Sequence, residues 1–340
     1  MALPAGTAGV FSPVNVAGIL LAKTDTSTPL FNMLGGAATV QSREFLTGSE
    51  YELGSASQPA ITEDASQTAP APTSTTRTQA KNVTQIFHRS VSVTYSKESD
   101  TQSLTGLNLA NLSNNVGSEL AFQTAGRIAE VRNDIEYTIL NGTYNLAVSS
   151  ATADKTRGLN AAITTNTTAA GDVELDGNIL VAVARQLAGT SPFGLNGVVG
   201  ILNAEQIVQL NKLILNEGQR FGRDDAGSNL LTYLTPFGRL RFMEGGHRYQ
   251  PNGTATFANI GRCRNVFRPV PGKGNFFLEA LAKTGAADKY QVYGQWGFDH
   301  GHEWTHAIVT GLKETTADYV APKVEIVSSA SSPVYTDEVS

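Results

Sequence analysis

The sequence predicts an α+β fold, because one long amphipathic helical pattern accompanies many short strand patterns without a repeating strand–helix–strand unit. The strands are expected to form a mixed or antiparallel sheet. The helix is expected at 114–141. Strands are expected at 82–96, 194–202, 239–244, 254–260, 264–270 and 275–282, and alternation returns within 289–312.

The segment 114–141 has the clearest helical pattern. Its apolar residues recur at three- and four-residue steps, as Val116, Leu120, Ile128, Val131, Ile135 and Ile139. Ser113 or Asn114 can cap its start, and Asn141 with Gly142 can end it. At about 1.5 Å per residue the helix is roughly 40 Å long. That length favours a spine along the molecule over a core helix of a small enzyme.

The remaining elements follow from local patterns. In the strand 82–96 one face is predicted to carry Val83, Gln85, Phe87, Arg89, Val91, Val93 and Tyr95. Two further helices are expected at 176–188 and 203–217, opened by Asp176 and Asn203. Residues 218–238 are expected to form a polar, glycine-rich loop.

Composition narrows the classes of function. The 340 residues are 41% hydrophobic and 16% charged, with a net charge of −5. This balance excludes a general basic attraction to nucleic acid or an anionic membrane. The single cysteine, Cys263, cannot form an internal disulfide. The apolar run 16–22 is too short to cross a bilayer and has no basic leader, so we expect a soluble protein used without export.

Residues 1–80 are rich in Thr, Ser, Ala and Pro and have few large apolar residues. Such a segment cannot bury enough apolar area to order itself. It is therefore either a disordered tail or an extended arm and loop that orders against a partner. The alternation of 43–53 predicts strands of a hairpin, interrupted by PAPTSTT at 70–76.

The segment HEWTH matches the zinc-protease motif H-E-x-x-H, with His302 and His306 as ligands and Glu303 as general base. The chemistry requires a helix, a third ligand and an open coordination position. The third ligand is hard to find: the spaced Gly and His of the metzincin pattern are absent, with Val309 at the relevant position, and the acids that lie downstream are Glu314, Asp318 and Glu325. A zinc-dependent hydrolase is therefore kept only as the alternative function, and no catalytic, cofactor or metal residue is assigned.

The local pattern around HEWTH favours a strand. One face would then carry Trp296, Phe298, His300, His302, Trp304, His306 and Ile308, with Glu303 on the opposite face. A metal held between subunits by His300, His302 and His306 stays open. His88 and His247 have no evident partners for chemistry, and the arginine-rich stretches 238–242 and 261–268 are read as exposed strand positions or intersubunit salt bridges.

Several short stretches, in order along the chain, resemble the major capsid proteins of tailed bacteriophages with the Hong Kong 97-type capsid fold. The resemblance is closest to the branch that contains the capsid protein of phage "S U ten". The stretches are TPLF at 28–31, NVTQIF at 82–87, EVRNDIE at 130–136, RGL at 157–159, LAKTG at 281–285 and HAIVTGL at 306–312.

The resemblance implies a division of the chain. It implies an N-terminal arm (1–43), an extended loop and returning strand (44–96) and a peripheral domain with the spine helix (97–172). It also implies an axial domain of mixed sheet with flanking helices (173–288), closing strands of the peripheral domain (289–312) and a C-terminal tail (313–340).

The resemblance also implies a structural function without catalysis. The chain would assemble with itself as pentamers and hexamers into an icosahedral shell, in the virion, around double-stranded DNA without sequence-specific binding. Scaffolding, portal and decoration proteins are possible further partners, and no membrane is involved. No long charged segment precedes the arm, so a scaffold is expected to be a separate protein.

Overall fold

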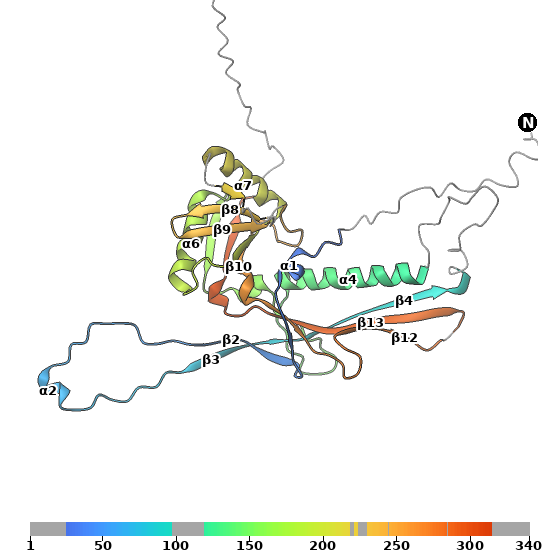
Figure 1. Cartoon of the computed structure of the whole chain (residues 1–340), viewed down its shortest axis with the longest axis horizontal. Coiled ribbons are helices and arrows are strands. Elements are labelled where there is room, and N and C mark those ends of the chain that lie inside the picture. Colours follow the sequence, from blue (N-terminus) through green and yellow to red (C-terminus); the bar gives the residue numbers. More distant parts are fainter. Residues whose placement is uncertain are drawn as a thin grey trace, which may run out of the picture.

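The computed structural model describes residues 25–96, 119–217, 221–223, 230–243, 245–283 and 285–314. It has a body with two sheets, a long helix along one side, and a two-stranded ribbon that projects from the body (Figure 1). No described helix is long and apolar enough to cross a membrane. The expected helix start at 114–118 and the tail 315–340 lie outside the described residues.

The first sheet has five strands built around β13 (Ala287–Asp299). One edge of β13 pairs with β4 (Gln85–Thr94) over ten positions, and the other edge pairs with β11 (Arg264–Phe267) and β12 (Phe276–Ala280). The short strand β1 (Ala37–Thr39) runs parallel to β11. The buried side chains of β4 are Phe87, Val91 and Val93, which confirms the alternation predicted for this strand.

The second sheet has seven strands in the order β5-β14-β10-β6-β9-β8-β7. Their bounds are β5 Thr167–Val173, β6 Val198–Ile201, β7 Phe221–Arg223, β8 Leu230–Thr235, β9 Gly238–Met243, β10 Ala255–Asn259 and β14 Ala307–Leu312. Helices α6 (Gly177–Thr190) and α7 (Ala204–Glu217) accompany it. Both begin as predicted: the Asp176 carboxylate accepts from the Ile179 amide, and the side chain of Asn203 accepts from the Gln206 amide.

The helix α4 (Glu119–Asn141) ends at the predicted residue. Its C-terminal half packs into a core shared by both sheets, with Val131, Ile135 and Ile139 buried. Ile128, on the same predicted stripe, is 46% exposed, as is Phe122 at 47%. The predicted apolar face is therefore covered over only half of the described helix.

Two predictions need correction. Residues 218–238 do not form a loop throughout, because β8 lies within them and buries Tyr233 against β9. The strand expected through 296–308 stops at Asp299, and a 3₁₀ turn (Glu303–Thr305) follows it. Strands β13 and β14 belong to different sheets, so the chain has to change direction between them.

The boundary expected at residue 288, between the axial domain and the closing strands, does not separate the two sheets. Strands β11 and β12 fall within 173–288 but pair with β13, whereas β14 falls within 289–312 but pairs with β10. Strand β5, expected mostly within 97–172, pairs with β14. Each sheet thus draws its strands from both sides of the expected boundary.

Candidate functional site: the projecting ribbon, its turn and the arm base

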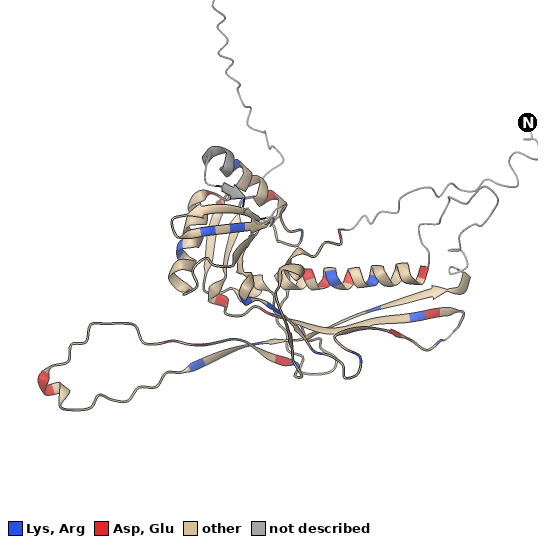
Figure 2. Cartoon of the chain, in the orientation of Figure 1, with Lys and Arg blue, Asp and Glu red and all other residues tan. Residues whose placement is uncertain are grey.

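The ribbon consists of β2 (Glu44–Tyr51) and β3 (Arg77–Val83), which pair antiparallel, and of the connection between them with the short helix α2 (Glu63–Ser66). Every residue from 49 to 81 is exposed. Residues 52–76 contain three acidic and no basic side chains, and the acidic pair Glu63 and Asp64 lies at the tip (Figure 2). Within one chain this segment therefore buries none of its side chains.

The ribbon is anchored at its base on both strands. Thr47 of β2 is buried, and its hydroxyl donates to Asp299 Oδ1 at 2.6 Å. Asn82 of β3 is buried, and its side chain donates to the Phe298 carbonyl at 2.7 Å and accepts from the Arg157 amide at 2.8 Å. These buried bonds connect both strands to the end of β13.

The HEWTH residues form the turn beside this base, and the structure sends their side chains to different places. His302 Nε2 donates to the Ser49 carbonyl at 3.0 Å. Glu303 accepts from the amides of Thr164 and Thr165, both at 3.0 Å. His306 is fully buried. Within the described residues no three His, Cys, Asp or Glu side chains are grouped to hold a metal.

The electrostatics of the turn suit a structural role. Burial raises the pKa of Glu303, but the hydrogen bonds from Thr165 and Thr164 outweigh it and leave the pKa below its ordinary value. Burial lowers the pKa of His306 to about 4. His306 Nδ1 accepts from the Asn259 amide at 2.9 Å, so Nε2 carries the proton and donates to the His300 carbonyl at 2.7 Å.

His300 lies behind the turn and is also buried. Neither of its ring nitrogens has a hydrogen-bond partner, and burial lowers its pKa to about 4. His300, His302 and His306 therefore do not share one strand face, because the strand has ended before they begin.

The arm base, residues 25–34, contains α1 (Pro29–Met33), which rests on α4. Glu136 of α4 is fully buried and accepts from the Leu30 amide at 2.7 Å and the Phe31 amide at 2.8 Å. His247, in the loop after β9, lies with Nε2 2.9 Å from Glu136 Oε1. One carboxylate thus joins the arm base, α4 and the second sheet.

Sequence reasoning missed this joint, since it found no partner for His247. The available signal was Glu136 itself, an acidic residue directly after Ile135 in the buried part of the apolar stripe. A buried carboxylate needs partners, but the sequence does not say which distant residues supply them.

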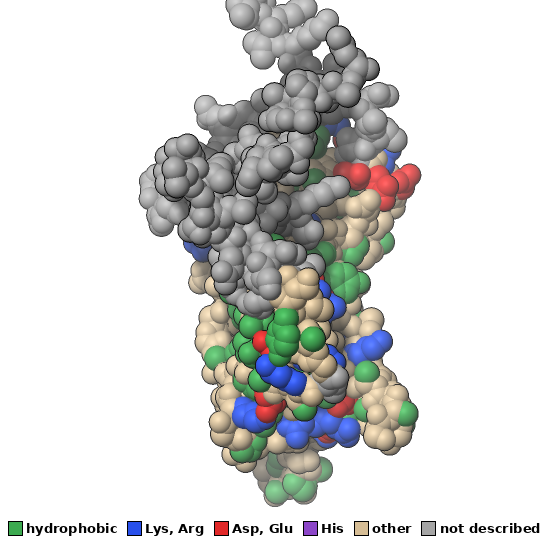
Figure 3. Space-filling view, turned by 90° about the vertical axis from the view of Figure 1, so that its right-hand side faces the viewer, with side chains coloured by type: hydrophobic (Ala, Val, Ile, Leu, Met, Phe, Trp, Pro, Cys, Tyr) green, Lys and Arg blue, Asp and Glu red, His purple; other side chains and the backbone are tan. Residues whose placement is uncertain are grey.

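An apolar groove of about 370 Å³ lies between α4 and the first sheet. Its walls include Ile128, Val131 and Ile135 of α4 and Phe276 to Leu278 of β12. In Figure 3, which views the end of the molecule where α4 begins, hydrophobic side chains gather beside lysines and arginines. Exposed apolar side chains thus line a groove on this side of the first sheet.

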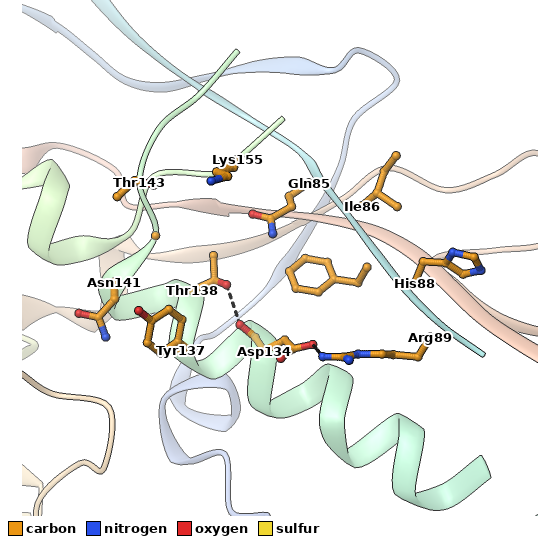
Figure 4. Close-up of a pocket in the computed structure, with 12 residues that line it drawn as sticks. Gln85, Ile86, His88, Arg89, Asp134, Tyr137, Thr138, Asn141, Thr143 and Lys155 are labelled. Atoms are coloured by element: carbon orange, nitrogen blue, oxygen red, sulfur yellow. Dashed lines mark hydrogen bonds and ion pairs between the residues drawn. The ribbon is translucent and has the colours of Figure 1, made fainter. Parts of the chain in front are cut away.

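A second cleft, of about 500 Å³, lies between the C-terminal half of α4 and β4 (Figure 4). Arg89 and Asp134 point toward each other in it and form an ion pair at 2.6 Å. His88 points away and meets Gln291 Oε1 at 3.0 Å. The cleft brings together no nucleophile, base and orienting group, so its geometry does not support catalysis.

The arginine-rich stretches have separate surroundings. Arg239 and Arg241 occupy exposed positions of β9, as predicted. Arg262 lies over the Phe193 ring at 3.7 Å, and Phe193 in turn stacks on Trp304 of the turn.

Comparison with known proteins agrees with the structural role that the geometry of the turn suits. Residues 3–313 match the family model described as SU10 major capsid protein. No protein of curated function has a detectable sequence match to the chain.

Several solved structures share the fold of this chain. The capsid of cyanophage A-1(L) is 10% identical, with a TM-score of 0.60 over 89% of this chain and 98% of that one. The holo-SrpI encapsulin complex of Synechococcus elongatus PCC 7942 is 10% identical, with a TM-score of 0.58 over 88% and 94%. Mycobacterium phage Patience is 10% identical, with a TM-score of 0.53 over 85% and 84%. At these identities the likeness concerns the fold alone.

Proposed function

The chain belongs to the SU10 major capsid protein family and is a major capsid protein of a tailed phage that forms the icosahedral head, and we propose from this premise that its copies join through the ribbon, the arm base and α4. The single observation that carries the proposal is the ribbon, exposed at every residue from 49 to 81. It carries Tyr51, Leu53 and Ile61, each more than 60% exposed. Covering these residues on a neighbouring copy supplies the burial that one chain cannot.

In this proposal the ribbon is the extended loop, and α4 with the first sheet forms the peripheral domain. The second sheet with α6 and α7 forms the axial domain, which gathers copies as pentamers and hexamers. The sheet memberships support moving β11 and β12 to the peripheral domain and β5 and β14 to the axial domain.

The shell in this proposal encloses double-stranded DNA without reading its sequence. A net charge of −5 supports confinement without tight binding. Scaffolding, portal and decoration proteins are the other partners that membership in the family implies. The apolar groove beside α4 is available to one of them or to another copy.

Electron microscopy of the purified full-length chain tests the assembly role of the ribbon. The decisive variant replaces 52–76 by Asn-Gly, which closes β2 and β3 with a tight turn at their last pair, Tyr51 and Arg77. We expect the variant to fold with an unchanged unfolding transition and to form no closed shells. Normal shells from it would overturn the assigned role of the ribbon.

A further inference from the structure

The HEWTH turn contacts the ribbon at a point where the ribbon has already left the body. Thr47 is the last buried residue of β2, and Ser49 and Glu50 beyond it are exposed. Both are nevertheless bound to the turn: the Ser49 carbonyl accepts from His302, and Glu50 Oε2 accepts from Trp304 Nε1 at 2.6 Å. These two bonds lie outside the buried anchors and act on one strand of the ribbon only.

The backbone between the anchor and these bonds is specialised. Strand β2 shifts register between Thr47 and Ser49, and Gly48 between them has a φ of +59°. A Cβ at Gly48 would lie 2.8 Å from the Gly301 carbonyl oxygen. The ribbon therefore bends at a bulge that fits closely against the turn, and bulges of this kind redirect a strand.

On its other side the HEWTH turn is bonded to residues 164–166, so its position relative to the body is fixed. Glu303 holds the amides of Thr164 and Thr165. The Asn166 side chain donates to the Trp304 carbonyl at 2.7 Å and to the His306 carbonyl at 2.9 Å. The Trp304 ring is also stacked on Phe193, with ring centroids 6.3 Å apart.

We propose that His302 and Trp304 are positioning residues that set the direction in which the ribbon leaves the body. Thr47 and Asn82 hold the ribbon in place, while the two outer bonds hold its orientation. Because these outer bonds reach exposed residues, they can break and reform without unfolding the base. The inference rests on the proposed function of the ribbon, since orientation matters for a segment that has to reach a neighbouring copy.

The test measures the orientation of the ribbon directly. Spin labels are placed at Ser66→Cys in the ribbon tip and at Asn211→Cys on α7, both at exposed positions. Cys263 is fully buried and burial raises its pKa, so it competes poorly for the label. Labelled full-length chains are diluted into unlabelled ones before assembly, and double electron–electron resonance then reads distances within single chains.

The variants distinguish loss of the two outer hydrogen bonds from loss of the fold. Trp304→Phe removes the N–H donor and keeps an aromatic ring for Phe193, and Glu50→Gln weakens the acceptor without touching the turn. His302→Ala removes the other bond, and His302→Gln restores a donor. Glu52→Gln makes the same charge change as Glu50→Gln two residues further out, where all neighbours are exposed, and serves as the matched control.

We expect Trp304→Phe, Glu50→Gln and His302→Ala to raise the fraction of chains outside the main distance population roughly three- to tenfold, the factor that corresponds to one hydrogen bond. Glu52→Gln and His302→Gln should match the parent chain, and no variant should shift the unfolding temperature by more than about 2–4 °C. A distance distribution that no variant changes would overturn the inference. Shell formation by the parent chain, checked by electron microscopy, tests the proposed function separately.

Discussion

The arm base and the ribbon both connect the body to segments beyond it, but they are held by contrasting means. At the arm base a fully buried carboxylate, Glu136, takes three hydrogen-bond partners from two other regions. The buried residues of the ribbon, Phe45, Thr47, Asn82 and Val83, all lie at its base, and every residue from 49 to 81 is exposed. A buried anchor makes a fixed joint, whereas exposed bonds leave a segment free to reorient.

The largest expected effect is acid destabilisation from the histidines beneath the ribbon. Burial lowers the pKa of His300 and of His306 to about 4, against 6.5 when unfolded. Between these values the unfolded chain binds more protons, so stability falls as the pH drops. The slope is on the order of 1.4 kcal/mol per pH unit for each histidine. Denaturant unfolding from pH 7 to pH 4 measures it, and His306→Gln should reduce the slope.

The next effect is expected at the arm base. Glu136→Ala leaves the Leu30 and Phe31 amides and His247 without their acceptor and should cost about 3–5 kcal/mol in the free energy of unfolding. Glu136→Gln keeps one acceptor oxygen and should cost less. Glu130→Ala, on the same helix with a side chain 43% exposed and surface ion pairs to Arg89 and Arg127, is the control and should cost less than about 1 kcal/mol. Equal losses for Glu136→Ala and Glu130→Ala would show that the buried joint does not hold the arm base.

A smaller effect is expected where the ribbon bends. Gly48→Ala forces a Cβ into a backbone with φ of +59° and against the Gly301 carbonyl. It should destabilise the chain by about 1–3 kcal/mol. Gly54→Ala, in the same ribbon with open space around it, should change the unfolding free energy by no more than about 0.5 kcal/mol. The two unfolding curves give the comparison directly.

The smallest effect on stability is expected on the exposed half of α4. Ile128→Gln should change the unfolding free energy by about 0.5 kcal/mol or less, because that side chain is 46% exposed. Ile135→Ala, two turns further along the same face of the helix and buried in the core, should cost about 2–5 kcal/mol. If the Ile128 variant folds but forms fewer shells, the groove beside α4 is an assembly surface. Unchanged shell yield would remove that role.

The sequence predicted the elements whose signal is local. The helix that ends at Asn141, the starts of α6 and α7 at Asp176 and Asn203, and the alternation of β4 all follow from periodicity and capping. The family was also predicted correctly, from short stretches in a characteristic order.

The sites that depend on distant pairs were not predictable in this way. HEWTH looked like a strand because alternation and aromatic residues continue through it, yet the change of sheet between β13 and β14 requires a turn. Glu136 and His247 are 111 residues apart, and no local pattern connects them. Strand β8 was not predicted because the glycines and charged residues before Leu230 made the whole segment 218–238 resemble a loop.

The strand pairing determines the order in which parts of the chain can fold during synthesis. The strand β4, made early, pairs with β13, and β5 pairs with β14, so neither sheet is complete until residues 287–312 have left the ribosome. The ribbon strands are close in sequence and pair with each other alone. Distant pairings close late and local ones early. The ribbon strands of a nascent chain can thus pair with each other before either sheet is closed, and the complete body forms only after residue 312 has been synthesised.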